Sequence, residues 1–179
     1  YPVREICPPD TCQWDVFQRV TFRRMGTLTW DELSTQLNTK SQVLCVVNTR
    51  KAAKEVYERL DKTESFHLST LMCPAHRQRQ LEKIRTRLEE QLPCRVVSTS
   101  LIEAGVDVDF PSVFREIAGL DSILQAAGRC NREGKRSVAE SEVTVFESEL
   151  KTPPLFSIPV GAARHIMARY SDFSSQSAI

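Results

Sequence analysis

The chain has 179 residues, a length that suits a single domain with its own hydrophobic core. Its apolar fraction of 41% and charged fraction of 26% are ordinary for a globular protein. The net charge of +1 excludes a strong overall attraction to nucleic acid or membranes, and no apolar run reaches the roughly 20 residues that a membrane span needs. If the chain binds nucleic acid, local donors must provide the contacts, and the chain alone should bind weakly.

The first residues and the spacing of the cysteines indicate the kind of protein and the redox environment to which the chain belongs. It begins at Tyr1 without a signal-peptide pattern, and we expect it to be a piece of a larger protein. The six cysteines show no C-x-x-C spacing and no histidine pair that would complete a zinc site. Cys45 and Cys94 lie in apolar runs and are expected to be buried, and Cys7 and Cys12 form the only close pair. A reducing, cytoplasmic setting fits this pattern best.

The first thirty residues are expected to form a proline-rich lead-in followed by an edge strand over 16–24, where apolar and polar residues alternate. A short helix should follow, from Thr29 or Asp31 to Leu37. Strands and helices then alternate along the chain. The expected strands are 42–47, 66–70, 95–99, 113–117 and 142–146, and the expected helices are 52–60, 81–92, 122–132 and 161–170.

This alternation predicts an α/β fold. Right-handed crossovers between successive strands give a parallel sheet that is covered by helices on both faces. We expect a single domain over 31–150, preceded by the lead-in and edge strand of 1–30. Residues 151–179 are expected to be an extension that is partly helical and frayed at its serine-rich end.

Three of the expected strands end in small polar residues or are followed by them directly. In a parallel sheet these positions lie along one edge, at the carboxyl ends of the strands, where α/β proteins bind ligands. Hydroxyl groups and backbone N–H groups at such an edge could hold successive phosphates of a nucleic-acid strand. The alternative is that they are ordinary helix N-caps, which every α/β domain needs. The residues are Asn48, Thr49, Ser69, Thr70 and Thr99.

A G-x-D turn follows the third of these junctions. Gly105 permits a tight turn and a close approach of the backbone to a ligand. Asp107 could accept hydrogen bonds from a ribose hydroxyl, or from an arginine across a cleft. The alternative is a plain loop in which Asp107 caps a turn.

Two arginines lie in the segment QAAGRCNREG, over 125–134. Arg129 and Arg132 are three residues apart, so we expect them to project from one face of the helix. Two guanidinium groups on one face form a clamp for phosphate oxygens. The alternative is a purely structural helix that begins with a capping box of Ser122 and Gln125 and whose arginines favour its negative end.

Taken together and in this order, the segments resemble superfamily-two helicases. STSLIEAGVDVDFP followed by QAAGRCNREG resembles their motifs V and VI. LCVVNTRKAAKEVYERL resembles motif IV in the second RecA-like domain of the CRISPR-associated helicase–nuclease of type I systems, and LSTLMCPAHR and EAGVDVDF are particularly similar to that family. The resemblance covers about residues 31–146. Ala126 stands where many of these helicases have arginine, which argues against a typical RNA helicase.

The resemblance implies a role for each marked residue. ATP with magnesium would be bound mainly by an absent first RecA-like domain, and single-stranded DNA would cross both domains. The implied partners are that first domain, the nuclease domain of the same protein and the CRISPR surveillance complex. Arg129 and Arg132 would be arginine fingers, Gln125 would couple nucleotide state to closure, Gly105 and Asp107 would touch the nucleotide, and Asn48, Thr49, Ser69, Thr70 and Thr99 would contact the DNA backbone.

Several features of a complete motor are missing from the sequence. No G-x-x-x-x-G-K-[ST] loop is present, and 134–137 is a near miss with the wrong spacing. No acidic pair follows an apolar strand to hold magnesium. The three histidines, His67, His76 and His165, form no cluster that would serve a metal-dependent nuclease. We therefore expect the chain to be inactive alone.

Two other classes of function stay open at this point. The chain could be a non-catalytic α/β module that binds nucleic acid or acts as a scaffold. It could also be a free-standing cysteine enzyme that uses Cys73 or Cys130, although no histidine has a recognisable relation to either thiol.

Overall fold

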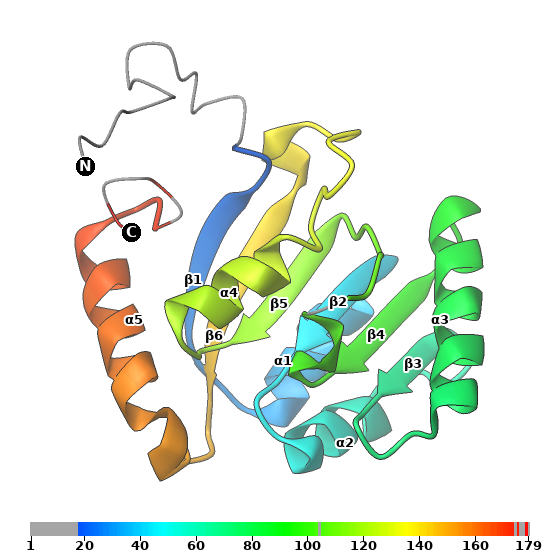
Figure 1. The fold of residues 1–179 in the computed structure, drawn as a ribbon, viewed down its shortest axis with the longest axis horizontal. Helices are drawn as coiled ribbons and strands as arrows, with labels where there is room; N and C mark the ends of the chain where they lie inside the picture. Colours follow the sequence, from blue (N-terminus) through cyan, green and yellow to red (C-terminus); the bar gives the residue numbers. More distant parts are fainter. Residues whose placement is uncertain (1–17, 104, 174, 176–177, 179) are drawn as a thin grey trace, which may run out of the picture.

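Six parallel strands form one sheet in the order β1-β6-β5-β2-β4-β3, and helices cover both of its faces (Figure 1). The computed structural model describes residues 18–103, 105–173, 175 and 178. The predicted α/β fold with a parallel sheet is confirmed.

All of the expected elements occur, with some changes of bounds. The strands are β1 (Thr21–Leu28), β2 (Gln42–Val46), β3 (Ser65–Leu68), β4 (Cys94–Ser98), β5 (Ser112–Glu116) and β6 (Glu142–Ser148). The helices are α1 (Trp30–Asn38), α2 (Arg50–Glu58), α3 (Pro74–Glu89), α4 (Leu120–Ala127) and α5 (Ser157–Arg169). Short 3-10 turns lie at η2 (Ser100–Ile102), η3 (Val138–Glu140) and η4 (Pro154–Phe156).

Three of these bounds differ from the expectation for physical reasons. β1 begins at Thr21 and runs beyond Arg24, because its parallel pairing with β6 extends from Thr21 to Leu28. Residues 18–20, expected to belong to the strand, lie before this pairing and are not part of it, and residues 16 and 17 lie outside the described residues. α3 begins at Pro74, since proline is well tolerated in the first turn of a helix. α4 ends at Ala127, well short of Arg132, because Cys130 forms a bridge with Phe110 instead of a further helical turn.

The helices α1 and α2 cover one face of the sheet, and α3, α4 and α5 cover the other. β2 is central, and its continuous apolar run is explained by burial on both faces: Leu44 packs toward α3 and α4, whereas Cys45 packs toward α1 and α2. α1 begins with a capping box, in which the Thr29 side chain accepts a hydrogen bond from the backbone N–H of Glu32.

α5 packs on β6 and beside α4. The boundaries proposed at residues 30 and 150 stay predictions.

Four cysteines are described, and all four are free. Cys45, Cys94 and Cys130 are buried, as expected for the first two, and Cys73 is exposed. Burial raises the pKa of Cys130 to about 12. A thiol with so high a pKa is a poor nucleophile, which argues against an enzyme built on Cys130. Cys7 and Cys12 lie outside the described residues.

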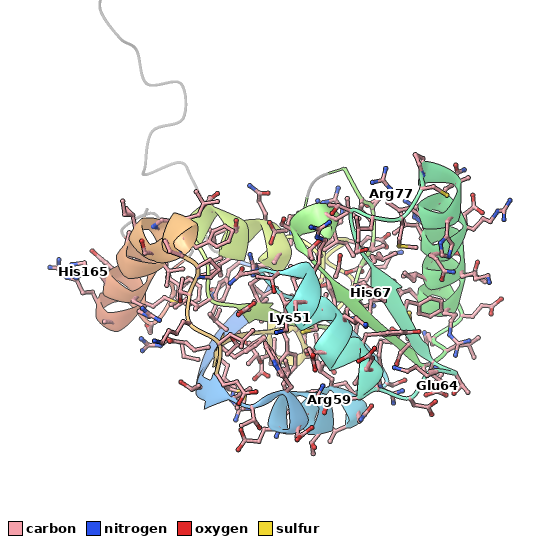
Figure 2. The ribbon with its side chains drawn as sticks, turned by 90° about the horizontal axis from the view of Figure 1, so that it is seen from below. Lys51, Arg59, Glu64, His67, Arg77 and His165 are labelled. Atoms are coloured by element: carbon pink, nitrogen blue, oxygen red, sulfur yellow. The ribbon has the colours of Figure 1, made fainter. Side chains whose placement is uncertain are left out.

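The histidines do not come together. His67 on β3 and His165 on α5 lie at opposite ends of the domain (Figure 2). Among residues 18–103, 105–173, 175 and 178, no group of three or more His, Cys, Asp or Glu side chains could hold a metal ion. None of the described helices has the length and apolar character to cross a bilayer.

His67 should make the domain sensitive to acid. Its ring stacks on Tyr57 with the centroids 5.5 Å apart, and its Nε2 is buried with no hydrogen-bond partner among the described residues. Burial lowers the pKa of His67 below its usual 6.5, and Lys62 adds to this effect. Because the folded state disfavours the protonated ring, the stability that depends on a neutral His67 is complete above pH 6.5 and declines as pH falls below it.

We expect His67→Phe to lose less stability than the wild-type domain between about pH 7.5 and about pH 5. Phenylalanine keeps an aromatic ring beside Tyr57 and cannot be protonated. Urea unfolding at the two pH values measures the difference. The control His165→Phe, at an exposed position on α5, should follow the wild type. An equal loss in His67→Phe and in the wild type would contradict the prediction.

Candidate functional site

The carboxyl ends of three neighbouring strands place the predicted polar residues along one edge of the sheet. β4 lies between β2 and β3, and its Ser98 pairs with Val46 of β2 and with Leu68 of β3. The residues that follow these three positions are therefore aligned. The edge carries Asn48, Thr49, Thr99, Ser69 and Thr70, and the structure brings all five together as expected.

The side chains along this edge are not equally available. The Thr49 hydroxyl accepts a hydrogen bond of 3.1 Å from the backbone of Ala52 and caps α2, so the N-cap interpretation holds for this residue. Asn48 donates through Nδ2 to the Ile117 carbonyl at 2.8 Å. Thr70 is exposed, whereas the Thr99 hydroxyl is buried and has no partner among the described residues. Of these two hydroxyl groups, only that of Thr70 is therefore accessible to a ligand in this structure.

The chain leaves the helical conformation directly after α4. Gly128 caps the helix, and Cys130 then forms an isolated parallel bridge with Phe110, just ahead of β5. The Phe110 N–H donates to the Arg129 carbonyl at 2.9 Å, and the Asn131 N–H donates to the Phe110 carbonyl at 3.0 Å. The prediction of a helix to Arg132 is therefore wrong, because pairing with Phe110 competes with another helical turn.

Asn131 allows the chain to turn at this point. It has a φ of 47°, in the left-handed region that asparagine tolerates better than most residues. Its side chain is buried and donates to the carbonyls of Arg19 and Arg136 at 2.9 and 2.8 Å. The alternative of a capping box at Ser122 is also wrong, because the N-cap of α4 is Gly119 and no side chain caps it.

Arg129 and Arg132 do not share a helix face, and that prediction is wrong. Arg129 is only 8% exposed, and it donates through Nε to the Ile102 carbonyl at 3.1 Å and through Nη2 to the Glu103 carbonyl at 2.6 Å. The side chain of Arg132 is 44% exposed, and its Nε lies 2.7 Å from Oδ1 of Asp107. One guanidinium group is therefore part of the interior, and the other lies at the surface.

The Gly105 turn brings Asp107 to Arg132. Gly105 has a φ of +69°, a conformation that strains any residue with a side chain. Asp107 is exposed, and its carboxylate accepts a hydrogen bond from the Arg132 guanidinium group of the same chain. Asp107 therefore has a specific partner and does not only cap a turn. Asp109 fixes the backbone of the turn by accepting from the Arg132 N–H at 2.8 Å. Gly105, Asp107 and Arg132 meet at one surface, and Gln125 lies exposed on α4.

A buried polar network, which the sequence did not predict, lies beneath the carboxyl edge. Arg115 of β5 is 2% exposed, and its Nε forms an ion pair with Oε1 of Glu103 at 3.0 Å, without the alignment of a hydrogen bond. Its Nη1 donates to Oδ1 of Asn48 at 2.8 Å. Glu116 accepts from the Asn48 N–H and from the Ser148 hydroxyl, both at 2.6 Å. The sequence feature that could have predicted the network is the pair of adjacent charged residues, Arg115 and Glu116, in a strand that was expected to be buried.

Burial dominates the electrostatics of this network. It raises the pKa of Glu103, and the nearby Arg115 opposes the shift. It also lowers the pKa of Arg115, against the influence of Glu103 and Glu116. The Glu103 carboxylate therefore depends on Arg115 to remain ionised, and the guanidinium group of Arg115 depends on Glu103 to offset its loss of hydration.

The sequence matches a family model described as "CRISPR-associated nuclease/helicase Cas3, C-terminal" over residues 39–135. A CRISPR-associated nuclease/helicase Cas3 of Methanothermobacter thermautotrophicus is 30% identical over 138 residues, which are 74% of this chain and 17% of that protein. One of Haloferax volcanii is 51% identical over 65 residues, 36% of this chain and 7% of that protein. The chain thus spans less than a fifth of the length of either relative.

Solved structures show the same fold. The crystal structure of T. fusca Cas3-ATP superposes with a TM-score of 0.66 at 18% identity, over 84% of this chain and 21% of that one. The C-terminal domain of the DEAD-box protein Dbp5 gives a TM-score of 0.61 at 14% identity, over 86% of this chain and 88% of that one. With the family model matching over half of its length, the chain belongs to the Cas3 family, of which it is a helicase C-terminal (second RecA-like) domain.

Proposed function

We propose that this domain is the second RecA-like half of an ATP-dependent translocase on single-stranded DNA that acts in CRISPR interference. ATP lies between this domain and a first RecA-like domain in this proposal. The observation that carries it is the state of Arg132, whose exposed guanidinium group is paired with one exposed carboxylate, Asp107. Such a pair is weak, so the arginine can leave it for a phosphate at little cost.

The residues fit the outer part of a nucleotide site. Arg132 offers a planar set of donors to phosphate oxygens, and the released Asp107 can accept from a ribose hydroxyl. Arg129 does not fit as a direct phosphate ligand in this conformation, because its guanidinium group is buried and already donates to two carbonyls. We assign the magnesium to the first domain, because no acidic pair follows an apolar strand in this sequence.

In the proposed mechanism Arg132 acts as an arginine finger. It stabilises the negative charge that develops on the γ-phosphoryl group when the two domains close. Gln125, exposed on α4, is assigned to the coupling of nucleotide state to closure. Opening after hydrolysis returns Arg132 to Asp107 and completes one step along the strand.

The carboxyl edge of β2, β4 and β3 is the proposed path of the DNA backbone. The exposed hydroxyl group of Thr70 is its best donor, and Ser69 and Thr99, which are buried in this structure, are assigned to the same edge. Asn48 and Thr49 contribute mainly by shaping the edge, because their side chains already have protein partners. The net charge of +1 supports weak binding by the domain alone. The nuclease domain and the CRISPR surveillance complex are proposed partners of the whole protein.

The proposal is tested by reconstitution. We expect no DNA-stimulated ATP hydrolysis from this chain alone, because its sequence has no phosphate-binding loop. Adding the first RecA-like domain of the same helicase should restore hydrolysis that depends on single-stranded DNA. Robust hydrolysis by the chain alone would overturn the proposal. If neither the mixture nor the two domains joined on one chain hydrolyses ATP, the result would favour a non-catalytic scaffold.

A further inference from the structure

The short segment that links the DNA edge to the nucleotide side is the η2 turn with the residue that follows it, Ser100–Glu103. Thr99 precedes this turn on the carboxyl edge, and Gly105 and Asp107 follow it. Any effect of DNA on the nucleotide site that travels along the backbone must pass through this turn. Contacts that hold it from the side therefore decide how rigid the link is.

One side of the turn is held by Arg129. Its two hydrogen bonds to the carbonyls of Ile102 and Glu103 are 3.1 and 2.6 Å long and are buried. The Arg129 carbonyl accepts from Phe110, and the Asn131 N–H donates to Phe110. These contacts connect the η2 turn to the backbone that carries Arg132.

The other side of the turn is held by Arg115. Its Nε is 3.0 Å from the Glu103 carboxylate, and its Nη1 donates to Asn48 at 2.8 Å and to the Glu116 carbonyl at 2.7 Å. Asn48 and Glu103 lie on different segments of the domain, and Arg115 joins them. Glu103 is thus held at its carboxylate by Arg115 and at its carbonyl by Arg129.

This arrangement lies directly beneath the proposed DNA path. Asn48, Ser100 and Arg115 line a pocket of about 320 Å³, whose other walls are the start of α4 and the η4 turn. A strand on the carboxyl edge would therefore touch the residues that position the turn. A buried ion pair usually contributes little stability compared with apolar packing of the same volume, so stability alone does not explain why the pair is here.

We propose that Glu103 and Arg115 are positioning residues that transmit DNA occupancy of the carboxyl edge to Arg129 and on to Arg132. This inference rests on the proposed function. Contact of DNA with Asn48 and Ser100 shifts Arg115, the ion pair moves the η2 turn, and Arg129 carries the movement to the turn that holds the arginine finger. Neither Glu103 nor Arg115 touches ATP.

The test uses the helicase with both RecA-like domains and compares ATP turnover with and without saturating single-stranded DNA. The double variant Glu103→Gln/Arg115→Met removes both charges and leaves neither one buried without its partner. We expect the ratio of stimulated to basal turnover to fall about tenfold, which corresponds to a coupling of about 1.4 kcal/mol. A purely structural role would lower both rates in proportion and leave the ratio unchanged.

The matched control is Glu64→Gln/Arg95→Met, which removes an ion pair of 2.7 Å that joins the start of β4 to the residue before β3, away from the η2 turn. It should keep the wild-type ratio. A folded Glu103→Gln/Arg115→Met variant with the wild-type ratio overturns the inference. If that variant does not fold, the test uses Arg115→Lys instead. The ratio should then fall about threefold, because an ammonium group lacks the planar fork of arginine. An unchanged ratio in Arg115→Lys overturns the inference. A wild-type helicase without DNA stimulation would instead contradict the proposed function.

Discussion

Replacing Arg132 by alanine should lower the DNA-stimulated kcat for ATP hydrolysis by about 10³-fold to 10⁵-fold in the helicase with both RecA-like domains. An arginine finger acts on charge that exists mainly in the transition state, so its removal affects kcat more than the affinity for ATP. Steady-state hydrolysis with saturating single-stranded DNA measures the loss. Arg132→Lys should retain only part of the activity, because lysine offers a point charge without the planar fork.

The same substitution should leave the fold intact. Arg132 and Asp107 have side chains that are 44% and 79% exposed, and exposed ion pairs of this kind contribute about 0–1 kcal/mol. The matched control is Arg164→Ala, which removes an ion pair to Glu147 of the same length, 2.7 Å, with 48% and 36% exposure. It should lose equally little stability and no activity. If Arg132→Ala hydrolyses ATP within about threefold of the wild type, Arg132 is not a finger.

The sheet and the polar edge could be predicted because their signals are local. A strand that is buried on both faces needs a continuous apolar run, and the run in β2 is visible without knowing its neighbours. Alternating strands and helices then force parallel pairing, which aligns the residues after β2, β4 and β3. No side-chain contact had to be known for that part of the prediction.

The end of α4 could not be predicted in the same way. Local pattern favours a helix through Arg132, whereas the structure ends it at Ala127. The competing interaction is the bridge between Cys130 and Phe110, which are far apart in the sequence. Gly128, which caps the helix, and Asn131, which adopts a positive φ, were the local hints that the chain turns here.

The buried network beneath the edge escaped prediction for a related reason. Arg115 and Glu116 are visible as charges within an apolar strand, but their partners come from other segments. Asn48 follows β2, and Glu103 follows η2. Asn48 was assigned to DNA from its residue type, its position after a strand and the family resemblance. Only the structure shows that its side chain is already engaged by Ile117 and Arg115.

Arg129 should behave in the opposite way to Arg132. Arg129→Ala leaves the buried carbonyls of Ile102 and Glu103 without their donors and opens a void, so we expect it to lower the free energy of unfolding by about 2–3 kcal/mol. Arg129→Lys should cost less, since one ammonium group can still reach one of the carbonyls. Urea unfolding of the isolated domain measures both, and Arg132→Ala should stay within about 0.5 kcal/mol of the wild type.

Comparing Arg129→Ala with Arg132→Ala therefore separates a structural role in the fold from a direct role in ATP hydrolysis. If Arg129→Ala lowers stability as expected, the guanidinium group holds the η2 turn in the working enzyme, and its effect on hydrolysis comes through the position of Arg132. If Arg129→Ala keeps its stability but loses hydrolysis, the guanidinium group must leave the Ile102 and Glu103 carbonyls when ATP binds. Arg129 would then act as a second finger, and domain closure would have to break two buried hydrogen bonds in each cycle.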